Sequence, residues 1–284
     1  MQMAFDFGAV EEITWVRDQL RPRYGDFGPV PVRTPIGQLV KSSISGRTRD
    51  EISLAAYRRL VDAYREWPDL ARASAGDVQA MIGDVTFPDV KARHLCDALH
   101  VIAAYQPSFD LTFLGGLSVA KALAWLERLP GVGRKVSAST LNFSTLNMPA
   151  FVIDTHILRI LGRYGFVRSN ADTRTAYDAV MATLYAWSAT DLAELHILMK
   201  RLGQTICRAD LACCPDCPIR QGCKAAVCSE TGQTAQRERG DRFRPGGHRN
   251  EHPRTRIEVS PHHREGGSVQ WPGASSSTVS SSRS

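Results

Sequence analysis

Residues 129–135 read Leu-Pro-Gly-Val-Gly-Arg-Lys, and this short stretch joins two segments whose apolar residues recur at helical spacing. Gly131 and Gly133 permit a tight turn and leave backbone N–H groups unshielded, while Val132 can tuck between the two helices. Exposed amides at the start of a helix bind anions such as a DNA phosphate. We therefore predict a phosphate-binding turn between two helices. Its predicted DNA-binding residues are Gly131, Val132, Gly133 and Arg134.

Helical spacing extends through most of the first 228 positions, for example at Ile157, Leu161 and Tyr164, and sustained two-residue alternation is hard to find. Proline and glycine mark the breaks between segments. Ser74 and Asp50 are candidate helix caps. The predicted helices cover residues 9–20, 50–67, 74–82, 90–105, 118–129, 134–143, 154–164, 172–187 and 190–207. The sequence therefore predicts an all-α fold.

Composition limits the class of protein. The chain has 284 residues, 43% of them hydrophobic, which is enough for one large domain or two modest ones. A net charge of +6 favours a polyanionic partner, although it also fits a merely soluble protein. No signal-peptide pattern and no apolar run of about 20 residues is present, so we expect a cytoplasmic protein without a membrane partner. Seven cysteines in such a reducing compartment favour metal binding over disulfides.

The composition changes abruptly after Cys228. Residues 229–284 are dominated by Arg, Glu, Gly, His and Ser, with nine basic and six acidic side chains. Such a segment cannot bury enough apolar surface to offset its ordering entropy, so we predict a disordered basic tail. It can add a loose attraction to phosphates, or it can serve only as a solubilising extension.

Four cysteines stand in the spacing C-x6-C-x2-C-x5-C, at Cys207, Cys214, Cys217 and Cys223. Four thiolates around one compact loop suit either zinc or a four-iron, four-sulfur cluster. A metal centre would also staple a loop-rich segment that is too small to hold a core of its own. The remaining cysteines, Cys96, Cys213 and Cys228, are not expected to be ligands.

Three motifs in a fixed order resemble the helix-hairpin-helix (HhH-GPD) DNA glycosylases, and within them the endonuclease III group. They are LPGVGRK at 129–135, VIDTHILRI at 152–160 and the four-cysteine array, and the resemblance covers roughly residues 10 to 225. It implies a two-lobed all-α fold with DNA between the lobes, and a 4Fe-4S cluster in place of zinc. The implied domains are an N-terminal segment packing with the cluster domain (1–35), a helical barrel with the hairpin (36–144), the cluster domain (145–228) and the tail (229–284).

The resemblance implies that Lys135 and Asp154 are catalytic. An amine can capture the sugar carbon that the departing base leaves electron-poor, and the resulting Schiff base permits strand cleavage by β-elimination. A lysine with a pKa of about 10.4 is a poor nucleophile, so Arg134, the helix N-terminus and partial burial should lower the pKa of Lys135. In the family a carboxylate matching Asp154 stabilises positive charge on the sugar. Taken alone, Lys135 also fits a phosphate contact, and Asp154 a helix cap.

Two positions depart from the family pattern. In the string Ser45–Asp50, Arg47 replaces a glutamine that enters the gap left by the displaced nucleotide in relatives. In the loop before Lys91, Phe87 occupies the place of a short wedge residue and can stack between bases, or can be an ordinary buried Phe. We count Arg47, Phe87 and Lys91 as candidate DNA contacts that affect substrate choice more than the reaction.

The expected activity is excision of damaged pyrimidines, chiefly oxidised ones, followed by nicking of the strand. The expected partner is double-stranded DNA containing a damaged base or an abasic site, bound by a monomer. One alternative is a relative that acts on mismatched, methylated or alkylated bases. Another is a DNA-binding protein that kept the hairpin but lost the chemistry, although a pure binder needs neither Lys135 nor Asp154.

Overall fold

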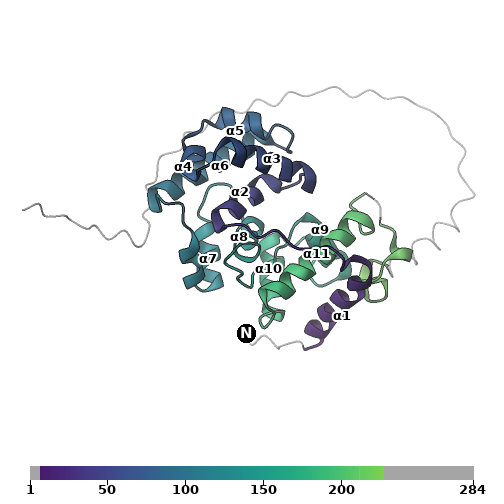
Figure 1. Ribbon diagram of the computed structural model, residues 1–284. Helices are drawn as coiled ribbons and strands as arrows, with labels where there is room; N and C mark the ends of the chain where they lie inside the picture. Colours follow the sequence, from purple (N-terminus) through teal and green to yellow (C-terminus); the bar gives the residue numbers. More distant parts are fainter. Residues whose placement is uncertain (1–6, 211, 227–284) are drawn as a thin grey trace, which may run out of the picture. The chain divides into compact units, whose positions relative to one another are not determined.

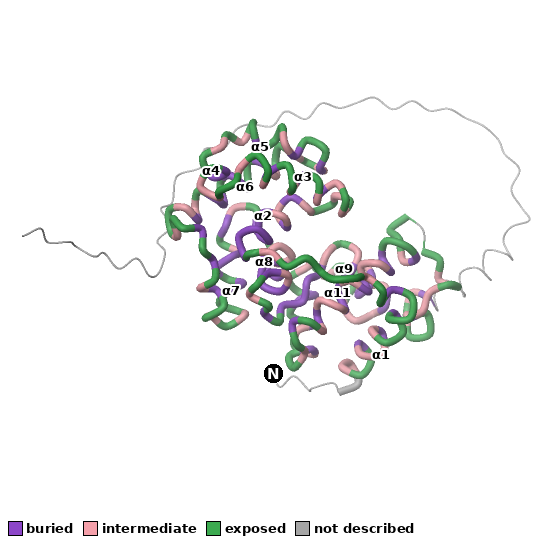
Figure 2. Tube along the Cα trace, in the orientation of Figure 1, coloured by how far each residue is buried: buried purple, intermediate pink, exposed green. Residues whose placement is uncertain are grey.

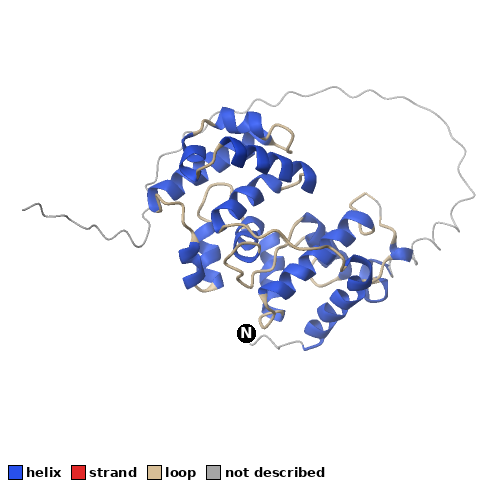
Figure 3. Ribbon diagram, viewed as in Figure 1, coloured by secondary structure: helices blue, strands red, loops and turns tan. Residues whose placement is uncertain are grey.

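The structure is a computed structural model that describes residues 7–210 and 212–226, all within one compact unit, Met1–Arg239. The predicted disordered tail, Cys228 and the second unit, Gly240–Ser284, lie outside the described residues. Across the described ranges all regular elements are helical, which confirms the all-α prediction (Figure 3). None of these helices is both long and apolar enough to cross a bilayer. The division of the first 228 residues into domains stays a prediction.

The order of elements is shown in Figure 1. The α-helices are α1 (Phe7–Tyr24), α2 (Pro35–Ser45), α3 (Asp50–Ala63), α4 (Trp67–Arg72), α5 (Ala75–Met81), α6 (Pro88–Tyr105), α7 (Val119–Leu126), α8 (Arg134–Asn142), α9 (Thr155–Tyr164), α10 (Thr173–Thr183) and α11 (Ala189–Thr205). Three short 3-10 helices are η1 (Thr112–Gly116), η2 (Cys214–Asp216) and η3 (Arg220–Gly222).

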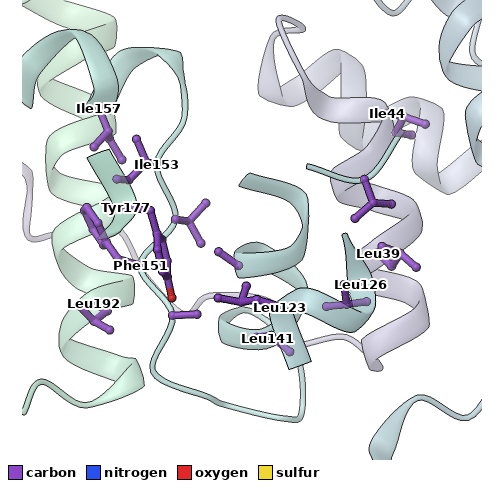
Figure 4. Close-up of a cluster of buried hydrophobic side chains, with 14 of the residues drawn as sticks. Leu39, Ile44, Leu123, Leu126, Leu141, Phe151, Ile153, Ile157, Tyr177 and Leu192 are labelled. Atoms are coloured by element: carbon purple, nitrogen blue, oxygen red, sulfur yellow. The ribbon is translucent and has the colours of Figure 1, made fainter. Parts of the chain in front are cut away.

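Two helices at the centre of the packing organise the molecule. Helix α2 packs against α3, α6 and α8, and α11 packs against α1 and α9. The inward faces of the helices are buried and their outward faces exposed, as amphipathic helices require (Figure 2). Part of the core beneath α8 is drawn in Figure 4, where the labelled side chains are Leu39, Ile44, Leu123, Leu126, Leu141, Phe151, Ile153, Ile157, Tyr177 and Leu192.

Helix α2 was not predicted from the sequence. Its start has clear signals, because Thr34 accepts a hydrogen bond from the N–H of Gly37 at 3.3 Å and Pro35 occupies the first turn. The run Lys41–Ser43 hides the apolar periodicity. Ser42 is nevertheless buried, and its hydroxyl bonds to Ser139 of α8 at 2.9 Å, so a satisfied polar contact replaces an apolar one at this helix crossing.

The predicted helix 50–67 is two helices. Helix α3 ends at Ala63 and α4 begins at Trp67, because Pro68 cannot continue a helix and restricts the residue before it. Asp50 does not cap α3 as expected. The cap position is Arg49, without a side-chain hydrogen bond, and the Asp50 carboxylate is bound to α11 instead.

Candidate functional site

The hairpin, residues 129–135, joins α7 to α8 as predicted. Gly131 has a φ of +71°, a left-handed conformation that favours glycine. Val132 is buried between the helices, 6% exposed, and its N–H bonds to the carbonyl of Leu129 at 3.1 Å. Gly133 precedes α8, and no atom lies within 4 Å of the position that a Cβ would take there. The first amides of α8 have no acceptor within the helix and adjoin this uncovered glycine.

The side chain of Arg134 is engaged within the protein. Its guanidinium pairs with Glu127, the residue that follows α7, lies 2.9 Å from Asp178 of α10, and stacks over the Tyr177 ring at 4.5 Å. Only 10% of the side chain is exposed. Arg134 therefore fastens the hairpin to α10, and a direct DNA contact by this side chain stays a prediction.

Lys135 lies in the first turn of α8 and is half-buried, with its amine 3.5 Å from the backbone carbonyl of Ser42 in α2. Burial, together with the charges of Lys41 and Lys200, lowers the pKa of Lys135 to about 8. The pKa of Lys135 is thus low, as expected, but the lowering comes from burial, Lys41 and Lys200 and not from Arg134. The charge of Arg134 is balanced by Glu127.

Asp154 caps α9 as predicted, and its Oδ1 accepts hydrogen bonds from the N–H groups of His156 and Ile157, each at 2.9 Å. Burial alone would raise the pKa of Asp154, but the hydrogen bond from the Ile157 N–H and the charge of Lys200 bring it below its ordinary value. Asp154 lies close enough to Lys135 for its charge to act on the amine. The structure therefore places the two predicted catalytic residues within electrostatic reach of each other, as an ionised carboxylate and a readily deprotonated amine.

His196 supports this carboxylate from α11. It is 8% exposed, and its Nδ1 lies 2.7 Å from the carbonyl of Val152. Burial lowers the pKa of His196 to about 4, so the ring is neutral at physiological pH.

Sequence reasoning missed three residues around the amine of Lys135: Lys41, Lys200 and Asp50. The Lys200 amine lies 2.6 Å from Asp50 Oδ1, and Gln204 donates to Asp50 Oδ2 at 3.1 Å. These contacts tie the start of α3 to α11 across about 150 positions of sequence, which no local pattern can reveal. The available signal was a lysine directly after a short apolar run, at position 41 after Leu39 and Val40 and again at position 200 after Leu198 and Met199.

The loops that carry Arg47 and Phe87 are joined to each other. Thr86 donates its hydroxyl to the carbonyl of Arg47 at 2.8 Å and its N–H to the Thr48 hydroxyl at 3.1 Å. Arg47 and Phe87 both have a positive φ, 55° and 57°, and both are exposed. Phe87 is thus an exposed residue, 55% accessible, and not a buried one.

Lys91 acts inside this loop pair. Its amine donates to the carbonyls of Ile44 at 2.9 Å and Gly46 at 2.6 Å, and to the hydroxyl of Thr48 at 3.0 Å. Burial lowers the pKa of Lys91 to about 8. The observed hydrogen bonds show that Lys91 holds the Arg47 loop in place. A DNA contact by Lys91 stays a prediction.

The cysteine array surrounds a cavity of about 410 Å³ beside α9 and the end of α11. Its sulfur-bearing lining residues are Cys207, Cys213, Cys214, Cys217 and Cys223. Among the described residues, no three Cys, His, Asp or Glu side chains converge as ligands of a single ion. A zinc ion draws its thiolates to about 2.3 Å from one centre, whereas the thiolates of a cluster bind different irons and stand farther apart. Soft donors around a roomy cavity therefore fit a cluster better than zinc.

Arg163 of α9 also faces the cysteine array. Its guanidinium lies 3.4 Å from Cys207 Sγ, and its carbonyl lies 3.6 Å from Cys223 Sγ. A cation beside these sulfurs favours their ionised, metal-binding form.

Comparison with known proteins identifies the family of the chain. A family model described as "HhH-GPD superfamily base excision DNA repair protein" matches residues 40–203, which is more than half of the chain. The chain is 27% identical over 190 residues to endonuclease III of Thermotoga maritima, covering 67% of this chain and 83% of the relative. It is 26% identical over 196 residues to endonuclease III of Sulfolobus acidocaldarius, covering 68% and 82%.

Solved structures share the fold. A trapped endonuclease III–DNA covalent intermediate superposes with a TM-score of 0.65 at 21% identity, covering 78% of this chain and 98% of that one. A thermostable thymine-DNA glycosylase gives a TM-score of 0.63 at 13% identity, covering 78% and 99%. The chain therefore belongs to the HhH-GPD superfamily of base excision DNA repair proteins, in which its similarity is to the endonuclease III group.

Proposed function

We propose that the protein is a base-excision repair DNA glycosylase with abasic-site lyase activity, which removes damaged, chiefly oxidised, pyrimidines from double-stranded DNA and nicks the strand. One observation carries the proposal: the half-buried amine of Lys135, with a pKa lowered to about 8, lies within electrostatic reach of the ionised carboxylate of Asp154. A protein that only bound DNA would gain nothing from an uncharged lysine, because phosphate contacts need the cation.

In this reaction the neutral amine of Lys135 attacks C1′ of the sugar, the bond from C1′ to the base breaks, and the base leaves with the bonding electron pair and takes up a proton. Nζ then loses one proton, the C1′–O4′ bond breaks as O4′ gains a proton, and the sugar ring opens to give an iminium between C1′ and Nζ. The iminium acidifies C2′, which loses a proton as the 3′ phosphate departs, and this step cuts the strand. The Asp154 carboxylate stabilises positive charge on the sugar and transfers protons.

DNA binding is assigned to two sets of groups. The uncovered amides around Gly133 and the start of α8 suit a phosphate of the lesion strand. Because the bond to be broken is inaccessible inside a duplex, the nucleotide must be flipped out. We propose that Arg47 and Phe87, which are exposed on loops joined by hydrogen bonds, enter the vacated gap together. We propose a monomer that acts in the cytoplasm, at the nucleoid if the source is bacterial.

We propose a 4Fe-4S cluster held by Cys207, Cys214, Cys217 and Cys223, with Cys213 outside the ligand set. The wide cavity and its soft donors support this assignment. When bound, the cluster supplies cross-links that stabilise a segment otherwise short of core, and it is given no part in the reaction.

Borohydride trapping on a panel of duplexes tests the function. Each duplex carries an oxidised pyrimidine, a mismatched thymine, a methylated or alkylated base, or an abasic site. We expect covalent complexes and nicking, strongest with oxidised pyrimidines, and their loss in Lys135→Ala. Activity confined to another lesion would move the protein to the alternative substrate class. Tight binding of abasic DNA with no turnover would instead make it a DNA-binding relative.

A further inference from the structure

Lys41 belongs to none of the sequence motifs described above, and unlike Lys200 and Asp50 it has no ion-pair partner among the described residues. It lies on α2 directly before Ser42, the residue whose carbonyl is 3.5 Å from the Lys135 amine. Helices α2 and α8 pack together, so the positions of the two lysines are fixed relative to each other by a buried interface. Lys41 is half-buried, and within the described part of the chain its amine forms no salt bridge and donates no hydrogen bond.

The neighbouring charges leave Lys41 unbalanced. The groups that face the Lys135 amine are Lys41 on α2, Lys200 and His196 on α11, Asp50 on α3, and Asp154 before α9. The Asp50 carboxylate is occupied by Lys200 and Gln204, at 2.6 and 3.1 Å. Asp154 has one oxygen engaged by the amides of α9. Lys41 itself is flanked by Arg33 as well as by Lys200, so its surroundings are cationic overall.

We propose that Lys41 is a positioning residue for the reaction: its unpaired positive charge, held beside α8 by the α2 packing, makes the nucleophilic amine of Lys135 easier to deprotonate. The inference rests on the proposed function, since it assigns a reason for the reactivity of Lys135. A lysine next to a second cation in a low-dielectric setting loses its proton more readily, because two ammonium groups repel each other there more strongly than in water.

The electrostatics agree with this geometry. Burial is the largest cause that lowers the pKa of Lys135 to about 8, and Lys41 is the next. Burial likewise lowers the pKa of Lys41 to about 8, with Lys200 adding to the effect. Near neutral pH Lys41 therefore carries most of its charge and acts on Lys135. The two amines titrate as a pair, so midpoints measured in solution belong to the pair.

The test compares Lys41→Met with Lys41→Arg, which keeps the charge at the same place. Lys121→Met is the matched control, because Lys121 is an exposed lysine on α7 and its loss changes the net charge equally. Single-turnover trapping on a saturating abasic duplex is followed from pH 6 to 10. We expect Lys41→Met to raise the midpoint by roughly one pH unit, to slow trapping about tenfold below the midpoint, and to match wild type at high pH. Lys121→Met should follow wild type, and Lys41→Arg should have the wild-type midpoint or a slightly lower one, because arginine keeps its charge above pH 8.

A DNA-free readout separates this inference from the proposed function. Reductive methylation with formaldehyde and cyanoborohydride, followed by mass spectrometry, reports how much free amine Lys135 presents at pH 7. Lys41→Met should slow methylation of Lys135 about tenfold, whereas Lys41→Arg should leave it unchanged.

Two results would overturn the inference. One is an unchanged midpoint and unchanged methylation of Lys135 in Lys41→Met. The other is an unchanged midpoint with a higher DNA concentration at half-saturation, which makes Lys41 a phosphate contact. If wild type forms no adduct with any duplex, the proposed function fails, and the methylation rates still decide the role of Lys41.

Discussion

Gly131 and His94 lie so close that a Cβ atom added to Gly131 would be 2.5 Å from the Cβ of His94. Gly131 also has a φ of +71°, which L side chains rarely adopt. We therefore expect Gly131→Ala to lower the free energy of unfolding by about 1–3 kcal/mol, measured by chemical denaturation. The hairpin should distort, and DNA binding should weaken with it.

Gly133→Ala is the matched control for the hairpin. Gly133 has a φ of −103° and nothing within 4 Å of its Cβ position, so alanine fits without strain. We expect unchanged stability, but weaker binding of duplex DNA and a shallower salt dependence, because the methyl group covers amides meant for a phosphate. Equal binding by wild type and Gly133→Ala in a salt titration would remove the hairpin amides from the interface.

Asp154 combines capping and proposed catalysis, and two substitutions separate them. Asparagine caps a helix as well as aspartate does, so Asp154→Asn should keep the melting temperature and reduce the single-turnover rate about 100-fold or more. Asp154→Ala should lose the rate and also about 1 kcal/mol of stability. If Asp154→Asn cleaves at the wild-type rate, the carboxylate serves only as a cap.

The low pKa of Lys135 predicts that activity and stability both rise with pH, over different ranges. The trapping rate should rise about tenfold per pH unit and level off near pH 8, where the amine becomes neutral. Charged Lys135 is destabilising in the folded state, because its pKa falls from 10.5 to about 8 on folding. Between these values the unfolded chain binds more protons, so this contribution to stability rises with pH.

The variant Lys135→Met measures directly how much the charged Lys135 side chain destabilises the folded state. We expect the variant to be more stable than wild type at pH 7, with a difference that shrinks between pH 8 and 10.5. Chemical denaturation at several pH values provides the measurement, with Lys121→Met as a control that should show no such trend. A constant difference would contradict the low pKa.

Phe87 is predicted to contribute to opening the DNA duplex and not to the stability of the protein. It is 55% exposed and has a φ of 57°, so Phe87→Gly should keep or raise the stability, by up to about 1 kcal/mol. The variant should excise paired lesions more slowly, and should process abasic sites, which need less unstacking, nearly as fast as wild type. A uniform loss on both substrates would contradict a role in opening the duplex.

The cysteine array gives a prediction about metal content. Cys207→Ala, Cys214→Ala, Cys217→Ala and Cys223→Ala should each lose iron and melt at lower temperature. Cys213→Ala should keep about four irons per chain, as four thiolates remain for one cluster. Iron analysis and visible absorption provide the measurement, and stoichiometric zinc in place of iron would contradict the cluster.

The sequence was most informative where chemistry depends on adjacent residues. The Gly131 turn, the buried Val132 and the cap at Asp154 each follow from a few neighbouring positions, and each was predicted. Helix α2 was missed because Ser42 occupies a buried position where an apolar residue would be expected. Its hydroxyl is satisfied there by a hydrogen bond to Ser139 on another helix. Residues brought together from distant helices have no local signature, and the pairing of Asp50 with Lys200 could be known only from the fold.

Both amides that α9 offers to Asp154 bond to the same oxygen, Oδ1. The carboxylate cannot rotate to exchange its two oxygens without breaking both hydrogen bonds. The orientation of the α9 axis therefore fixes the direction of Oδ2. That axis depends in turn on Gly203 of α11, where a Cβ would come within 2.7 Å of the His156 Cβ. The direction of Asp154 Oδ2 is thus set by how closely α9 and α11 approach each other. One methyl group at position 203 is enough to change that direction.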